Sequence, residues 1–216
     1  MNSPIEPPWL SLYVIAILKG GTRKTTTATM TSFALAERGE DVLVIDADHG
    51  TQGVADWATR VHVTGTPLPF HVAQWSPRAG LLVPFIQQQA RETGARRVIV
   101  DVGGEAPEVL RQVVLAATLV ISPAGPEQGE LARLPATRAI VAPAKVPMAV
   151  LLTRVPVPGG GAARDARADL AAEGYTVLDT EIGQNRALYA HVWGTVPADL
   201  GAYGDLADEL LKGERR

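Results

Sequence analysis

The stretch that decides the fold runs from residue 12 to residue 26 and reads Leu12-Tyr13-Val14-Ile15-Ala16-Ile17-Leu18, then Lys19-Gly20-Gly21-Thr22-Arg23-Lys24-Thr25-Thr26. The continuous apolar run is typical of a strand that is buried on both faces of a sheet. Lys24 to Arg38 has apolar residues at helical spacing and is followed by Gly39, which predicts a helix. A glycine-rich loop between a strand and a helix lets backbone N–H groups surround phosphate oxygens. We therefore predict a phosphate-binding loop, in which Lys24 reaches the β- and γ-phosphates and Thr25 binds Mg²⁺.

Strand and helix patterns continue to alternate after this stretch. Strands are expected at 42–45, 70–74, 97–102, 119–122, 147–153 and 176–179, and helices at 52–61, 81–92, 107–115, 128–141 and 162–173, with two helical pieces after them. This alternation predicts an α/β fold of three layers, in which a mainly parallel twisted sheet is covered by helices on both faces. Ligands of such sheets bind at the carboxyl ends of the strands. We expect residues 1–11, which are rich in proline, to form an arm and residues 12–216 to form one domain.

Composition excludes several classes of protein. The 216 residues include no cysteine, which excludes disulfides, a thiolate nucleophile and a cysteine-held iron–sulfur cluster. A cytoplasmic protein is the simplest expectation. No apolar run approaches the roughly 20 residues of a membrane span, and the amphipathic segment 205–212 is acidic, which disfavours binding to anionic lipid. Because the net charge is −3, any contact with DNA has to come from a local basic face.

Three aspartates follow predicted strands. Asp46 and Asp48 come after strand 42–45, and Asp101 lies near the end of strand 97–102. Carboxylates at strand ends beside a phosphate loop are the groups that Mg²⁺ and an attacking water require. Each aspartate taken alone has an equally good interpretation as a helix N-cap or a turn former. Their order along the chain, together with the loop, favours a nucleotide site.

The segment Lys19 to Thr26 resembles the deviant Walker A motif of the ParA/MinD family of P-loop ATPases, which is marked by a lysine before the glycine pair. The likeness extends over nearly the whole chain from Tyr13, and the segment 182–197 resembles the short plasmid-partition ParA proteins. The resemblance implies that ATP is bound with Mg²⁺. It assigns the nucleotide contacts to Gly20, Gly21, Thr22, Arg23, Lys24, Thr25 and Thr26 on the loop, and to Thr153 and Arg154 at the adenine.

The same resemblance implies a catalytic set of Lys19, Lys24 and Asp48. Lys19 would reach the phosphates bound by the other subunit of an ATP-dependent homodimer, comparable to an arginine finger. Asp48 would orient or activate the attacking water, while Thr25, Asp46 and Asp101 would hold Mg²⁺, the aspartates through water. The segment 101–104 would be a switch loop that senses the γ-phosphate.

The biological role implied is plasmid or chromosome partition. ATP hydrolysis would be slow and stimulated by a centromere-binding, ParB-like adaptor, and the ATP-bound dimer would bind DNA without sequence preference and associate with the nucleoid. Candidate contacts to DNA phosphates are Arg154, Arg164, Arg167 and Arg186.

Two positions depart from the family pattern. Arg23 stands where the family usually has glycine, so a left-handed backbone there would cost roughly 1–2 kcal/mol. Its side chain would either crowd the phosphates or add a guanidinium donor. His49-Gly50 replaces the usual Pro-Gln after Asp48. These departures keep open a nucleotide-impaired scaffold as one alternative, and a metabolic P-loop ligase as another, although Lys19 argues against the ligase.

Overall fold

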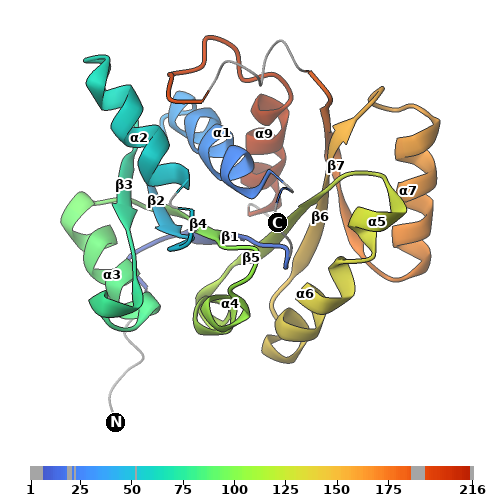
Figure 1. Ribbon diagram of the computed structural model, residues 1–216, viewed down its shortest axis with the longest axis horizontal. Coiled ribbons are helices and arrows are strands. Elements are labelled where there is room, and N and C mark those ends of the chain that lie inside the picture. The colour runs from blue at the N-terminus through green and yellow to red at the C-terminus, as the bar shows by residue number, and fades with distance from the viewer. Residues whose placement is uncertain (1–6, 19–20, 22, 52, 186–192, 215–216) are drawn as a thin grey trace.

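A seven-stranded parallel sheet forms the centre of the molecule (Figure 1). The computed structural model describes residues 7–18, 21, 23–51, 53–185 and 193–214. The strand order is β3-β2-β4-β1-β5-β6-β7. The strands are β1 (Ser11–Ile15), β2 (Val42–Ala47), β3 (His71–Gln74), β4 (Arg97–Val102), β5 (Leu119–Ala124), β6 (Met148–Val155) and β7 (Thr176–Gly183).

Helices cover both faces of the sheet, as the alternating pattern predicts. One face carries α1 (Lys24–Glu37), α2 (Gly53–Val63) and α9 (Tyr203–Gly213). The other carries α3 (Leu82–Thr93), α4 (Pro107–Val113), α5 (Gln128–Leu131), α6 (Leu134–Val141) and α7 (Gly161–Ala172). Short 3₁₀ turns occupy Pro77–Ala79, Val114–Ala116 and Ala142–Ala144. The predicted three-layer α/β fold is therefore confirmed.

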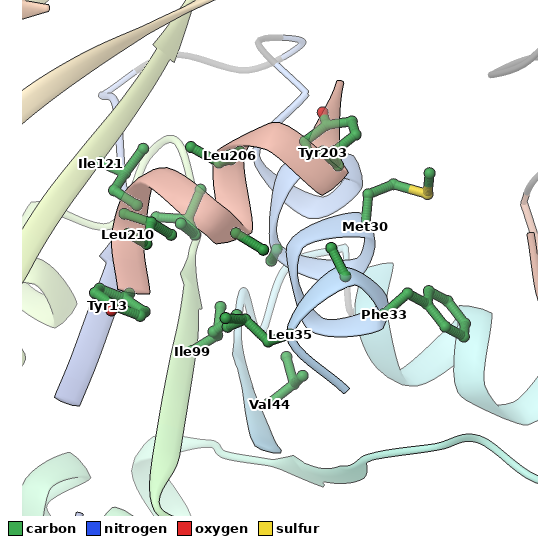
Figure 2. Close-up of a cluster of buried hydrophobic side chains, with 14 of the residues drawn as sticks. Tyr13, Met30, Phe33, Leu35, Val44, Ile99, Ile121, Tyr203, Leu206 and Leu210 are labelled. Carbon is green, nitrogen blue, oxygen red and sulfur yellow. The ribbon is translucent and has the colours of Figure 1, made fainter. Parts of the chain in front are cut away.

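Alternating side chains of the central strands explain this layering. Successive residues of a strand point to opposite faces, so continuously apolar strands can bury both. Val44 and Ile99 face α1 and α9, where Leu35 and Leu206 pack over the sheet (Figure 2). The residues next to Val44 and Ile99 along their strands point to the other face of the sheet. There they form a second hydrophobic cluster with side chains of α3 and α4.

The last helix is also tied to the first helix and the sheet by polar contacts. Arg38, at the end of α1, forms an ion pair with Asp208 and donates to the Gly204 carbonyl, both at 2.5 Å. Glu214, just after α9, accepts hydrogen bonds from the Tyr13 hydroxyl and from Arg97. These contacts hold α9 against α1 and tie the residue that follows α9 to the central strands β1 and β4.

Some element boundaries differ from the sequence-based expectations. The helix predicted for 128–141 is two helices, because Pro135 lacks an N–H and its ring would clash with the carbonyl four residues earlier. β1 ends at Ile15 instead of Leu18. β7 continues to Gly183, since two register shifts keep it paired with β6. At the N-terminal end, Trp9 is already buried against the domain.

Candidate functional site

Four of the predicted site residues, Thr25, Asp46, Asp48 and Asp101, lie together at the carboxyl ends of β1, β2 and β4. Asp46 and Asp101 are direct register partners on neighbouring strands, and Asp101 also pairs with Ile15 of β1. α1 begins at Lys24, and the Thr25 hydroxyl in its first turn donates a hydrogen bond of 2.7 Å to Asp101 Oδ2. The fold thus joins the start of α1 to the end of β4 through one short side-chain contact.

Asp101 is the most perturbed acid of this group. Its side chain is fully buried, and Oδ1 has no hydrogen-bond partner among the described residues. Burial, together with the charges of Asp46 and Asp48, raises the pKa of Asp101 to about 7, against the opposing effects of the Thr25 hydrogen bond and the Lys24 charge. A buried carboxylate oxygen without a donor fits a hydrated cation, so this residue suits an Mg²⁺ site.

Asp46 is committed to backbone contacts. It is fully buried, Oδ2 accepts the Ala55 N–H of α2 at 2.8 Å, and Oδ1 accepts the Asp48 N–H at 3.1 Å. Burial raises the pKa of Asp46, and these two hydrogen bonds oppose the change. The residue therefore anchors the first turn of α2, which is the capping role that the sequence left open. Each carboxylate oxygen retains a lone pair for a water molecule.

Asp48 shapes its own turn and lies against the segment after β4. Its Oδ1 accepts the N–H groups of Gly50 and Thr51 at 3.2 and 3.3 Å, and Oδ2 accepts the Thr51 hydroxyl at 2.7 Å. A β-carbon added to Gly103 would lie 2.9 Å from Asp48 Oδ1. The predicted switch segment 101–104 and the predicted water-orienting carboxylate are therefore in close contact.

A second glycine brings α2 up to the phosphate loop. A β-carbon on Gly53 would lie 2.9 Å from Thr25 Oγ1 and 2.8 Å from its Cγ2. The N-termini of α1 and α2 therefore converge at Thr25.

Lys24 and Arg23 stand at the start of α1. Lys24 is buried, which lowers its pKa, while the charges of Asp101 and Asp48 act in the opposite direction. Arg23 has φ 61° and ψ 28°, the left-handed conformation that glycine adopts without cost. The left-handed backbone, whose cost the sequence analysis gave as a condition, is therefore present at this position. Lys19, Gly20 and Thr22 lie outside the described residues.

Thr153 and Arg154 lie at the carboxyl end of β6, two strands from β1. Thr153 is buried and its Oγ1 has no hydrogen-bond partner in the described structure. Arg154 also has a left-handed backbone, φ 54°, and forms an ion pair with Glu130 of α5. Glu130 Oε2 in turn accepts the Gly125 N–H at 2.7 Å. Sequence reasoning missed Glu130, because a lone glutamate in a short polar helix carries no signal of its own.

A family model described as the CobQ/CobB/MinD/ParA nucleotide-binding domain (CbiA) matches residues 13–192. The chain belongs to this family. No curated protein matched the chain in a sequence search.

Solved structures share the fold of this CobQ/CobB/MinD/ParA domain. A Borrelia burgdorferi B31 protein assigned to plasmid partition, bound to AMPPNP, has a TM-score of 0.74 and 15% identity, over 94% of this chain and 99% of that one. The MinC:MinD cell division complex of Aquifex aeolicus gives 0.71 and 17%, over 94% and 96%. Cobyrinic acid a,c-diamide synthase of Mycobacterium smegmatis, with ADP and magnesium, gives 0.70 and 17%, over 95% of each chain. At these low identities, the TM-scores show a common fold.

The arginines predicted to contact DNA are placed differently in this CobQ/CobB/MinD/ParA domain. Arg154 is paired with Glu130, and Arg167 is paired with Glu181 at 3.1 Å. Arg164 is exposed on α7, and Arg186 lies outside the described residues. A DNA-binding face made by these residues stays a prediction.

Two further properties concern metals and membranes. Within the described ranges, no three His, Cys, Asp or Glu side chains are grouped so that they could hold a metal ion by themselves. An Mg²⁺ ion that keeps several waters and phosphate oxygens does not need such a group. None of the described helices has the length and apolar character that crossing a membrane requires.

Proposed function

We propose that the chain is a slow Mg²⁺-dependent ATPase that works as a nucleotide-gated switch in plasmid or chromosome partition. The observation that carries the proposal is the contact between Thr25 and Asp101, beside a buried carboxylate oxygen that lacks a donor. This contact places a hydroxyl and a carboxylate together at the N-terminus of α1, where an anion is also stabilised by the helix dipole. Membership of the CobQ/CobB/MinD/ParA family supports the nucleotide part of the proposal.

The proposal assigns the predicted site residues to the phosphates, the adenine and Mg²⁺. Gly20, Gly21, Thr22, Arg23, Lys24, Thr25 and Thr26 hold the phosphates of ATP, and Thr153 and Arg154 lie at the adenine. Thr25, Asp46 and Asp101 hold Mg²⁺, the aspartates through water. When bound, Mg²⁺ neutralises charge on the phosphates during their transfer.

Asp48 orients the attacking water in this scheme. Its carboxylate is fixed by three hydrogen bonds from its own turn, and it lies against Gly103 of the segment 101–104. A movement of that segment would therefore move Asp48. This close contact gives a route by which the state of the phosphates and the geometry of hydrolysis are coupled.

Lys19 and the partners complete the proposed switch. We assign the segment 19–26 as a deviant Walker A motif, with Lys19 reaching the phosphates of a second copy across an ATP-dependent homodimer. That dimer binds DNA without sequence preference, becomes nucleoid-associated, and is stimulated by a ParB-like adaptor. The similarity to a protein assigned to plasmid partition and to a MinD bound to its MinC partner supports this part of the proposal.

The first test is calorimetry with Mg-ATP on the purified chain. We expect Lys24→Ala to abolish binding, because this substitution removes a buried ammonium group beside the loop. Lys145 is exposed and lies outside the site, so the control variant Lys145→Ala should bind Mg-ATP normally. Absence of heat at millimolar Mg-ATP with the unchanged chain would refute the proposal.

The second test measures ATP hydrolysis and self-association. We expect Asp48→Ala to bind ATP, stall hydrolysis and trap the dimer, and Lys19→Ala to bind ATP but remain monomeric. Light scattering with AMPPNP, and phosphate release with and without DNA and adaptor, measure these properties. Normal dimerisation and hydrolysis by Lys19→Ala would contradict the cross-subunit role.

A nucleotide-impaired scaffold is the second candidate function. The left-handed Arg23 favours it, because a long side chain stands at the entrance to α1 in a conformation that usually belongs to glycine. A metabolic ligase is a third candidate, supported by the similarity to cobyrinic acid a,c-diamide synthase. Failure to bind Mg-ATP would favour the scaffold, and a rate that requires a small-molecule acceptor would favour the ligase.

A further inference from the structure

A pocket of about 570 Å³ opens next to Asp48, at the carboxyl ends of β2 and β3. It is lined by His49, Gln74, Trp75, Ser76, Pro77 and Arg78. None of these residues belongs to the proposed nucleotide site. The pocket is therefore a separate candidate ligand site, at the same carboxyl ends of the strands as the nucleotide site.

The walls of this pocket are held by the core of the fold. Gln74 is the register partner of Asp46, and the Trp75 N–H donates to the Asp46 carbonyl at 2.9 Å. The Trp75 ring is buried, and its Nε1 donates to the Gly80 carbonyl at 3.1 Å. These contacts anchor the backbone of the loop after β3, which continues into the 3₁₀ turn Pro77–Ala79 that carries the exposed Arg78.

The chemistry of the lining is that of an anion site. Arg78 brings a permanent positive charge, and His49 brings a ring N–H whether it is charged or neutral. The Ser76 hydroxyl and the Gln74 amide add neutral donors. No acidic side chain lines the pocket within the described part of the chain. Asp48 is next to His49 in sequence, but its carboxylate oxygens accept bonds from their own turn.

We propose that this pocket binds the carboxylate or phosphate group of a small second ligand, beside Asp48 and separate from the nucleotide. The guanidinium of Arg78 and the imidazole of His49 line the same pocket, so both can donate hydrogen bonds to one oxyanion group. Binding of the DNA backbone needs several cations spread along a face, and the net charge of −3 does not favour it here. The bound anion would contact the segment that carries Asp48, so the pocket is placed to influence hydrolysis.

The test uses the ring resonances of the histidines in NMR spectra of the full chain. Inorganic phosphate and acetate are titrated separately at constant ionic strength, with Mg-ADP present, and also in the Lys24→Ala variant, in which the proposed nucleotide site is disabled. The His49→Ala variant identifies the His49 signal. We expect this signal to shift and to saturate in the millimolar range with at least one of the two anions.

Matched residues control this test. His71 lies at the opposite end of β3 from Gln74, and His62 is on α2, so their signals report any general effect of the anion. We expect Arg78→Ala to weaken the apparent affinity about tenfold or more, as loss of a charge-assisted hydrogen bond does. Arg91→Ala, which removes an exposed arginine of α3 outside the pocket, should leave it unchanged.

The proposal is overturned if the His49 signal does not saturate, if His62 and His71 shift equally, or if Arg78→Ala has no effect. A stronger response to short duplex DNA than to phosphate and acetate would also overturn it in favour of a nucleic-acid contact. The His49 signal is read without ATP. Failure of the chain to bind Mg-ATP would therefore refute the proposed function and would not affect the test of the anion pocket.

Discussion

Replacing Arg23 by glycine isolates the cost of an unusual backbone at the entrance to α1. Arg23 has φ 61° and ψ 28°, and its carbonyl accepts the Thr27 N–H at 2.8 Å in the first turn of the helix. The helix therefore starts from a residue whose β-carbon disfavours the conformation that it must adopt. Glycine adopts the same conformation without that cost, so we expect Arg23→Gly to stabilise the folded state.

The magnitude follows from two opposing effects. Relief of the left-handed conformation is worth about 1–2 kcal/mol. Glycine also increases the conformational entropy of the unfolded chain, which lowers the free energy of unfolding by about 0.5–1 kcal/mol. We therefore expect a net gain of about 0.5–1 kcal/mol, which corresponds to a rise of about 1–4 °C in Tm for a chain of this size.

Calorimetric unfolding of the apoprotein measures this gain. Arg23→Ala serves as the reference, because it removes the guanidinium and keeps the strain, and Arg23→Gly should be the more stable of the two by the net gain estimated above. Lys145→Gly is the matched control, since Lys145 has φ 56° and ψ 25° at an exposed turn far along the chain. It should gain a similar amount without any change in Mg-ATP affinity. The reasoning is refuted if Arg23→Gly is less stable than Arg23→Ala while Lys145→Gly gains stability as expected.

Further predictions concern Asp101, Gly103 and Glu130. Because the folded apoprotein keeps the Asp101 proton up to a pKa of about 7, stability attributable to this group is present below the ordinary value near 4 and is lost as the pH rises through 7. Asp101→Asn should remove this slope, which amounts to at most about 4 kcal/mol in urea titrations. Gly103→Ala should push Asp48 aside, reducing ATP turnover about tenfold to a hundredfold and changing ATP affinity about twofold or less. Glu130→Ala should leave both Arg154 and the Gly125 N–H without their acceptor and cost about 1–3 kcal/mol of unfolding free energy, measured with urea.

Matched substitutions control these three predictions. Asp165→Asn, at an exposed position of α7, should keep the pH slope, and an unchanged slope in Asp101→Asn would contradict the assignment of the proton. Gly129→Ala adds a methyl group where no atom lies within 4 Å, so turnover should not change. Glu173→Ala removes an exposed carboxylate and should alter stability by less than about 0.5 kcal/mol. Equal effects at Glu130 and Glu173 would show that the two Glu130 contacts, with Arg154 and with the Gly125 N–H, contribute little.

The architecture and the meeting of the aspartates could be predicted because they depend on local patterns. Apolar runs that end in aspartates place Asp46 and Asp101 at strand ends, and parallel pairing then makes them direct neighbours. The left-handed backbone at Arg23 was considered only because the ParA/MinD family, which the segment resembles, usually has glycine at this position.

Other features depend on contacts between distant segments and could not be predicted. Nothing near Arg78 indicates that the loop after β3 brings it to the side of His49. The pairing of Glu130 with Arg154 joins two elements that have no sequence pattern in common. The split between α5 and α6 is a different case, because Pro135 is visible in the sequence and its effect on the helix is local.

The packing of α9 beside α1 has a consequence for synthesis of the protein. Leu206 and Leu210 cover the same apolar cluster as Leu35, although they are more than 150 residues later in the chain. During translation, the flank of α1 that packs against α9 therefore stays uncovered until residues 203–213 have been synthesised. Chains stalled before that point would expose apolar surface that is prone to aggregate. We expect chaperones that bind nascent polypeptides to bind this surface.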